Sequence, residues 1–192
     1  DFILQINYAL IYSSIQYKNQ IERYLGCNSK YFIALKNNKI VGAFPLMIFI
    51  NEKYGNVINS LPYYGSNGGI ILALTLSDIE KKNIRQLLLD EVIKYVEYNN
   101  ISASTFITNP LDIEQNKWFM KNVEYDFLAK KICQITQLPN NCSDVENALL
   151  DQYENPRRRN IRKAIKSGVT YYVSDKLEDF DFLYSIHKEN IE

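Results

Sequence analysis

The sequence predicts a layered domain of the α/β (α+β) class, in which helices flank a mixed β-sheet. Amphipathic helical stretches alternate with short strand-like runs between residues 8 and 138. A turn signal, Asn37-Asn38, separates two apolar runs, which is typical of a hairpin. Hydrophobic residues make up 46% of the 192 positions, which is enough for one core, and no run of about 18 uncharged apolar residues predicts a membrane span.

The expected elements follow from periodicity and from residues that begin or end helices. Gly26 ends the first helix, and Ser77 or Asp78 caps the longest one. Pro45 predicts a bulge or an edge in its strand, because proline cannot donate a ladder hydrogen bond. In order, we expect a helix over 8–25, strands over 30–36, 39–50, 55–60 and 69–74, a helix over 79–99, a strand over 102–108, a helix over 113–121, a strand over 124–138, and a short helix over 143–150 with a Ser143–Glu146 capping box. The apolar stripe of the 79–99 helix is Ile84, Leu87, Leu88, Val92, Ile93 and Val96.

A glycine-rich loop joins two of these strands. The stretch 60–71 reads SLPYYGSNGGII and holds three of the seven glycines, Gly65, Gly68 and Gly69. Glycine allows positive φ and close approach of a ligand to the backbone. The loop therefore either forms the floor of a polar-ligand site or is a long turn whose glycines serve chain geometry alone.

A basic helix is the strongest charge feature of a chain whose formal net charge is zero. Six of the 22 basic residues lie in 157–166, between Pro156, which suits a first turn, and Gly168, which suits a helix end. Arg158, Arg162 and Lys166 follow at intervals of four residues, on one side of the helix. This pattern predicts an anion site, although a solvated helix paired with the acidic remainder, or a weaker nucleic-acid surface, is also open.

The remaining residues offer little catalytic chemistry. After Gly168 we expect a strand over 169–173 and a helix over 177–190 capped by Ser174 or Asp175. The lone histidine, His187, lies on that helix and is expected to be a surface or packing residue. Cys27, Cys133 and Cys142 show no metal-ligand spacing, which predicts reduced thiols, a cytoplasmic location and no metal site.

Three motifs together resemble the Fem-type (FemAB-like) acyltransferases, which are built from two tandem GNAT-like domains. They are SLPYYGSNGG after a strand, NPRRRNIRKAIKSGV in the basic helix, and F-x-x-L-x-x-x-H in the last helix. The resemblance implies a GNAT-like domain over 1–150, with 151–192 as a connection and the incomplete start of a second one. Since the chain opens on Asp1 and closes within a helix, we expect it to be part of a longer polypeptide.

The resemblance also implies a function. It is the transfer of an acyl or aminoacyl group onto an amine of a bacterial cell-wall precursor or glycan, with acyl-CoA or aminoacyl-tRNA as donor substrate rather than covalent cofactor. Transfer RNA would be the one nucleic-acid partner. The pyrophosphate loop Q/R-x-x-G-x-G/A is absent, so the alternative is a non-catalytic GNAT-like binding module.

By this resemblance two sets of residues bind substrate. It does not identify the catalytic base, which could be an Asp, a Glu or water. The acceptor cleft is lined by the loop residues Tyr63, Tyr64, Gly65, Ser66, Asn67, Gly68 and Gly69. A phosphate-bearing substrate is faced by Arg158, Arg159, Arg162 and Lys166.

Overall fold

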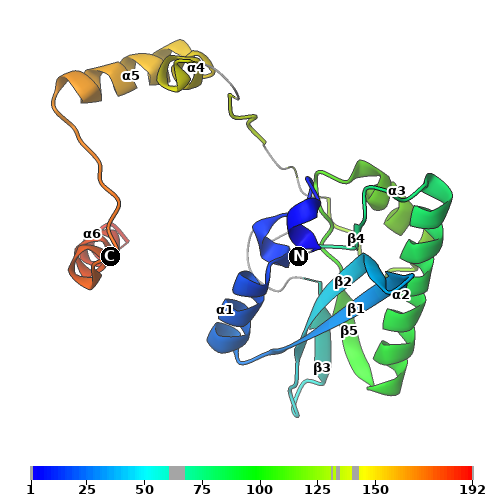
Figure 1. The fold of residues 1–192 in the computed structure, drawn as a ribbon. Coiled ribbons are helices and arrows are strands. Elements are labelled where there is room, and N and C mark those ends of the chain that lie inside the picture. The colour runs from blue at the N-terminus through cyan, green and yellow to red at the C-terminus, as the bar shows by residue number, and fades with distance from the viewer. Residues whose placement is uncertain (1, 61–67, 131, 133–134, 140–142, 192) are drawn as a thin grey trace. The chain divides into compact units, whose positions relative to one another are not determined.

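The structure is a computed structural model that describes residues 2–60, 68–130, 132, 135–139 and 143–191 (Figure 1). The chain divides into two units, Asp1–Cys133 and Gln134–Glu192. Each unit is described separately below. Among the described helices, none has the combination of length and apolar character that crossing a membrane requires.

The first unit is built on one mixed sheet. Its described strands are β1 (Asn28–Lys36), β2 (Lys39–Phe49), β3 (Asn56–Asn59), β4 (Ile71–Leu72) and β5 (Ile101–Thr105). They follow the order β1-β2-β3-β5, with β4 also pairing with β2. The pairs that involve β2 are antiparallel, whereas β3 and β5 are parallel. The predicted mixed sheet is therefore confirmed.

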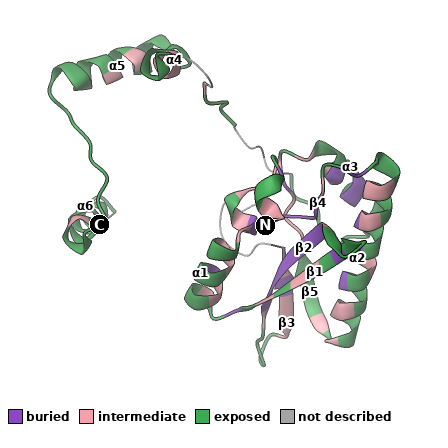
Figure 2. Ribbon diagram, viewed as in Figure 1, coloured by how far each residue is buried: buried purple, intermediate pink, exposed green. Residues whose placement is uncertain are grey.

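Helices cover both faces of this sheet. Alternate residues of β2 point to opposite faces, so each face supplies side chains that pack against a helix. Phe44, Leu46 and Ile48 pack in the main core with side chains of α2 (Asp78–Tyr98) and α3 (Ile113–Asn122). Met47 points the other way and packs against Ile21 of α1 (Ile15–Leu25). Figure 2 shows the buried positions concentrated along β2 and the inner side of α2. The predicted layers of helix, sheet and helix are confirmed.

Several features that the local sequence predicts are present in the structure. Gly26 ends α1 with φ 63°, in the left-handed region. Asn37 and Asn38 have φ 49° and 59°, as a tight hairpin between β1 and β2 requires. Ser77 and Glu80 form a complete capping box at the start of α2.

Two of the predicted boundaries shift. The first α-helix begins at residue 15 rather than 8, because Ser14 caps it by accepting a hydrogen bond from the Tyr17 amide. Short 3-10 turns, Ile3–Gln5 and Ile11–Ser13, precede it. The strand expected over 102–108 forms as β5, which starts one residue earlier and ends at Thr105.

The bulge expected at Pro45 lies elsewhere in the hairpin. The register shifts between Ala34 and Leu35, whereas Pro45 sits opposite Tyr31 in regular pairing. Along the other edge of β2, β4 pairs with residues 42–43 and β3 with residues 47–49. Pro45 therefore falls at a local edge between these two partners, in the part of the chain that the structure describes.

The predicted apolar stripe of α2 is confirmed only in part. Leu88 and Val92 are buried, and Ile84 and Val96 pack against the core, but Leu87 and Ile93 are 53% and 45% exposed. Leu89, which the prediction omits, is buried together with much of Arg85. The helix thus turns a slightly different side to the sheet than the spacing suggests.

The predicted strand over 124–138 is wrong for the described residues, which form no regular element there. Phe127 is 83% exposed and Ile132 is fully exposed. The alternation is ambiguous, since apolar side chains occur on both faces of the supposed strand, and no described strand pairs with it. A β-run without a neighbour cannot satisfy its backbone groups in a ladder.

The second unit contains α4 (Val145–Asp151), α5 (Asn155–Lys166) and α6 (Leu177–Glu189) in its described part. Asp144, not Ser143, caps α4 by accepting from the Asn147 amide. The predicted strand over 169–173 is wrong, because these residues form no regular element and pair with no described strand. Neither Ser174 nor Asp175 caps α6. No described residue of this unit is buried. The proposed division at residue 150 stays a prediction.

Candidate functional site

Both ends of the glycine-rich loop are fixed to one residue, Ile107, just after β5. The Ser60 hydroxyl accepts from the Ile107 amide at 2.7 Å and donates to its carbonyl at 3.1 Å. The Gly68 amide donates to the same carbonyl at 3.0 Å. The predicted acceptor residues Tyr63, Tyr64, Gly65, Ser66 and Asn67 lie between these anchors, outside the described residues.

The Gly68–Ile70 segment, by contrast, is buried, and one side chain holds it in place. The Gln115 amide oxygen accepts from the Ile70 amide at 2.7 Å, and its nitrogen donates to the Ile70 carbonyl at 2.6 Å. The same nitrogen donates to Asp112 at 2.9 Å. Gln115 is fully buried, so these bonds form away from water.

Gly69 is the one glycine of the loop for which the structure gives a clear requirement. It has φ +100°, and a Cβ built on it would lie 2.3 Å from the Gln115 oxygen. Any side chain there would combine an unfavourable backbone conformation with a clash. Gly69 thus allows Gln115 to reach the backbone of Ile70.

Tyr8 binds the backbone amide and carbonyl of Leu72, as Gln115 binds those of Ile70. Its hydroxyl accepts from the Leu72 amide at 2.9 Å and donates to the Leu72 carbonyl at 3.0 Å. The backbone N–H and C=O groups of successive strand residues face opposite edges. The Ala73 amide donates to the Val41 carbonyl of β2, whereas the backbone groups of Ile70 and Leu72 bind Gln115 and Tyr8 on the other edge. Two side chains therefore take the place of a neighbouring strand along this edge of β4.

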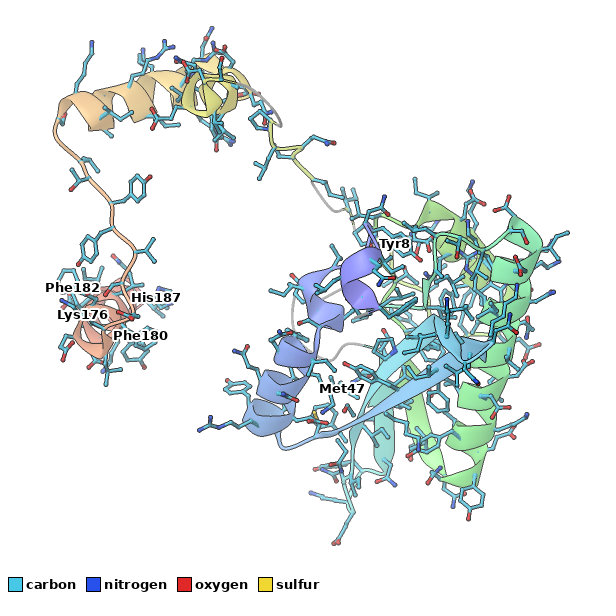
Figure 3. All side chains as sticks on the ribbon, viewed as in Figure 1. Tyr8, Met47, Lys176, Phe180, Phe182 and His187 are labelled. Carbon is cyan, nitrogen blue, oxygen red and sulfur yellow. The ribbon has the colours of Figure 1, made fainter. Side chains whose placement is uncertain are left out.

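An ion pair supports these two side chains. Arg85 of α2 contacts Asp112 at 3.3 Å, and each side chain is 11% exposed. Asn109 also holds the N-terminal segment by donating to the Tyr8 carbonyl at 2.7 Å. Burial raises the pKa of Tyr8, whose position in the first unit is labelled in Figure 3. Gln115 and Tyr8 thus bind backbone groups, whereas the buried Nε of Arg85 has no hydrogen-bond partner among the described residues.

Sequence reasoning missed Tyr8, Arg85, Asp112 and Gln115. One signal was present for Gln115, because it shares a helix side with Trp118 and Phe119 at intervals of three and four residues. A polar residue within an apolar stripe predicts a buried hydrogen-bonded group. Nothing in the sequence identifies the backbone of Ile70 as the hydrogen-bond partner of Gln115.

The other predicted site lies on α5, which forms as expected with Pro156 in its first turn. Arg159, Arg162 and Lys166 are exposed and make no salt bridge with any described residue. Arg158 differs, because it contacts Asp151 at 3.0 Å and donates to the Tyr153 carbonyl at 3.0 Å. The long side chains border an open groove of about 720 Å³ whose lining lies entirely within residues 155–167.

Two other expectations concern single residue types. His187 is exposed near the end of α6, where it is labelled in Figure 3, as expected of a surface residue. No group of three or more His, Cys, Asp or Glu among the described residues could hold a metal ion. Cys27 is buried, and its burial raises the pKa of the thiol.

Comparisons with known proteins give distant matches. No protein-family model and no curated protein matches the sequence. A ribosomal-protein-alanine N-acetyltransferase from Brucella melitensis biovar Abortus 2308 aligns with TM-score 0.41 and 11% identity, over 56% of this chain and 71% of that one. A probable acetyltransferase aligns with TM-score 0.45 and 13% identity, over 71% and 88%. An integron cassette protein from the mobile metagenome of V. cholerae aligns with TM-score 0.43 and 13% identity, over 77% and 86%. At these TM-scores the alignments assign neither a family nor a function.

Proposed function

We propose that this chain is part of an acyl- or aminoacyl-transferase of the Fem type, acting on an amine acceptor such as a cell-wall precursor or a sugar amine. The supports are the three sequence motifs and the mixed sheet with helices on both faces that the first unit forms. The donor is an acyl-CoA or an aminoacyl-tRNA, both of which carry phosphate groups.

The observation that carries the proposal is the state of the basic residues on α5. Arg159, Arg162 and Lys166 have no acidic partner among the described residues, so their charges are available to a substrate. Arginine forks bind phosphate oxygens in pairs, which scattered lysines do not achieve.

The acyl-transfer step requires few side chains of the protein. An amine that attacks an ester or thioester needs a proton acceptor and a donor for the developing oxyanion. The Gly68 amide is already bonded to the Ile107 carbonyl. The oxyanion donor is therefore sought in the loop residues before it, and the base remains to be chosen among Asp, Glu and water.

Binding measurements test the proposal directly. Acetyl-CoA and aminoacyl-tRNA are titrated into the 192-residue chain, and into a variant with Arg159→Gln and Arg162→Gln. We expect the double variant to lose about tenfold in affinity or more, as loss of charge-assisted bonds implies. A variant with Lys121→Gln and Lys130→Gln removes two exposed charges from the first unit and serves as the matched control. Equal affinities for all three proteins would count against the proposal.

A second candidate function is a non-catalytic binding module that uses the GNAT-like sheet as scaffold. The observation in its favour is that the Gly68–Ile70 segment is buried and internally bonded. This candidate predicts ligand binding without acyl transfer from either donor to any amine acceptor. Product formation detected by mass spectrometry would exclude it.

A further inference from the structure

Four basic residues of α5 form a compact strip. With 3.6 residues per turn, Arg159, Arg162, Lys163 and Lys166 fall within an arc of about 100° and extend over about 10 Å of helix axis. All four are exposed, and all line the groove on this helix. We refer to Arg159, Arg162, Lys163 and Lys166 as the cation quartet.

The cation quartet destabilises its own helix. Its members are neighbours at intervals of three and four residues, and each such like-charge pair costs about 0.2–0.5 kcal/mol. No described acidic residue forms a salt bridge with any of them. Within one helix, therefore, several repulsions act together without a salt bridge to any described acidic residue.

Other features of α5 offset this repulsion only in part, since Pro156 lies in the first turn and Lys163 and Lys166 lie in the last turn, where the helix dipole favours cations. Its N-cap residue, Glu154, makes no side-chain capping bond, and its first turn holds no acidic residue. None of its residues is buried. A helix of this length is marginal in water even without repulsion. An external negative charge beside the cation quartet would stabilise this helix further.

The two remaining arginines of α5 lie off the strip. Arg157 lies on the side of Ile161. Arg158 lies at the border and also lines the groove, but Asp151 and the Tyr153 carbonyl hold its guanidinium. Only 27% of the Arg158 side chain is exposed. Recruiting Arg158 to a ligand would require breaking these contacts, whereas the cation quartet is free.

We propose that the cation quartet binds a short linear chain of phosphate groups laid along α5, and that this anion stabilises the helix. The members of the cation quartet are spread over about 10 Å of the helix axis, which suits several consecutive anionic groups better than one carboxylate. The assignment adds Lys163 to the substrate-binding set and gives Arg158 a structural role. It rests on the proposed function only in that the donor carries phosphates.

Inorganic tripolyphosphate is the probe. It is titrated into the 192-residue chain while affinity is followed by calorimetry and helix content by far-ultraviolet circular dichroism. We expect helix content to rise on binding, because a ligand that prefers the folded form shifts the equilibrium towards it. The affinity should fall steeply with salt concentration.

Two double variants with the same change in charge separate the cation quartet from the rest of the helix. Arg159→Gln with Lys163→Gln should lose about tenfold in affinity or more and flatten the salt dependence. Arg157→Gln with Arg158→Gln, the control on the same helix, should lose less than about threefold. Glutamine keeps a helix propensity close to that of arginine and lysine, so intrinsic helicity is comparable.

Equal losses in the two variants, or no binding of tripolyphosphate in dilute salt, would overturn the proposal. A single-stranded hexanucleotide that binds more tightly, with the same dependence on the cation quartet, would uphold it and assign the phosphates to a nucleic-acid strand. Failure of acyl transfer in the assays above leaves these outcomes unchanged, so the two proposals fail separately.

Discussion

The two units both contain helices rich in large apolar side chains, but these side chains are buried to opposite degrees. In the first unit, Leu88 and Val92 of α2 are buried against Phe44 and Ile58 of the sheet. In the second unit, Phe180 and Leu183 of α6 are 61% and 64% exposed. An apolar stripe therefore suffices to predict a helix, whereas burial depends on a surface that lies opposite.

Strands show the same contrast more sharply. The run Ser-Ala-Ser-Thr after residue 101 became β5, because β3 offers it a parallel partner. The run over 169–173 is at least as rich in β-formers, yet it pairs with no described residue and is not a strand. A helix satisfies its backbone locally, but a strand does so only through a neighbour.

The largest expected difference between the units concerns core leucines. Leu88→Ala should lower the free energy of unfolding by about 3 kcal/mol, because it leaves a cavity in a packed core. Leu183→Ala should change it by less than about 0.5 kcal/mol. Urea denaturation followed by the fluorescence of Trp118, the only tryptophan, reports the first unit, and circular dichroism reports both. A large loss from Leu183→Ala would show that α6 is packed and would break the comparison.

Removal of the buried amide is the next largest effect. Gln115→Leu leaves the Ile70 amide and carbonyl without partners, which should cost about 3 kcal/mol. Gln86→Leu, on the exposed side of α2, is the control and should cost less than about 0.5 kcal/mol. Similar losses in both variants would mean that the Gln115 bonds contribute little beyond side-chain packing.

Two glycines with positive φ sharpen the comparison at a smaller scale. Gly69 and Gly168 have φ +100° and +76°, but an added Cβ meets Gln115 at the first and nothing within 4 Å at the second. Gly168→Ala should therefore cost about 1 kcal/mol, from backbone conformation alone. Gly69→Ala should cost about 2 kcal/mol or more, because the clash adds to the backbone strain. Equal thermal stabilities of the two variants would contradict the close approach at Gly69.

The smallest expected effect is on the free energy of unfolding at alkaline pH. Burial raises the pKa of Tyr31 to about 12, with Glu22 as a lesser cause. Since the neutral form is favoured on folding, its contribution is full below pH ~10 and is lost as pH rises towards ~12. Tyr31→Phe should remove this part of the alkaline loss, which denaturation at a series of pH values measures.

Tyr172 of the second unit is the counterpart of Tyr31, because its raised pKa has another cause. Its hydroxyl donates to Asp179 at 3.0 Å, and this bond is the main reason for the shift. Asp179→Asn should therefore return the pKa of Tyr172 towards its ordinary value. An ultraviolet titration that finds no change would show that the hydrogen bond is absent in solution.

The features that could be predicted from the sequence are those determined by neighbouring residues. Gly26, Asn37-Asn38 and the Ser77–Glu80 capping box act within a few residues, and each is confirmed. Gln115 and Tyr8 could not be assigned their roles, because their partners Ile70 and Leu72 lie 45 and 64 positions away. The cations of α5 were visible in the sequence, but the separate role of Arg158 depends on where Asp151 lies after folding.

The Gln115 amide stands in for a peptide group without belonging to the main chain, and this has a chemical consequence. Deamidation would turn it into a carboxylate of nearly the same shape, which could still accept from the Ile70 amide but would face the Ile70 carbonyl without a proton to share. That hydrolysis needs water, and the side chain is fully buried. The durability of this contact over the lifetime of the molecule thus depends on the fold remaining closed around it.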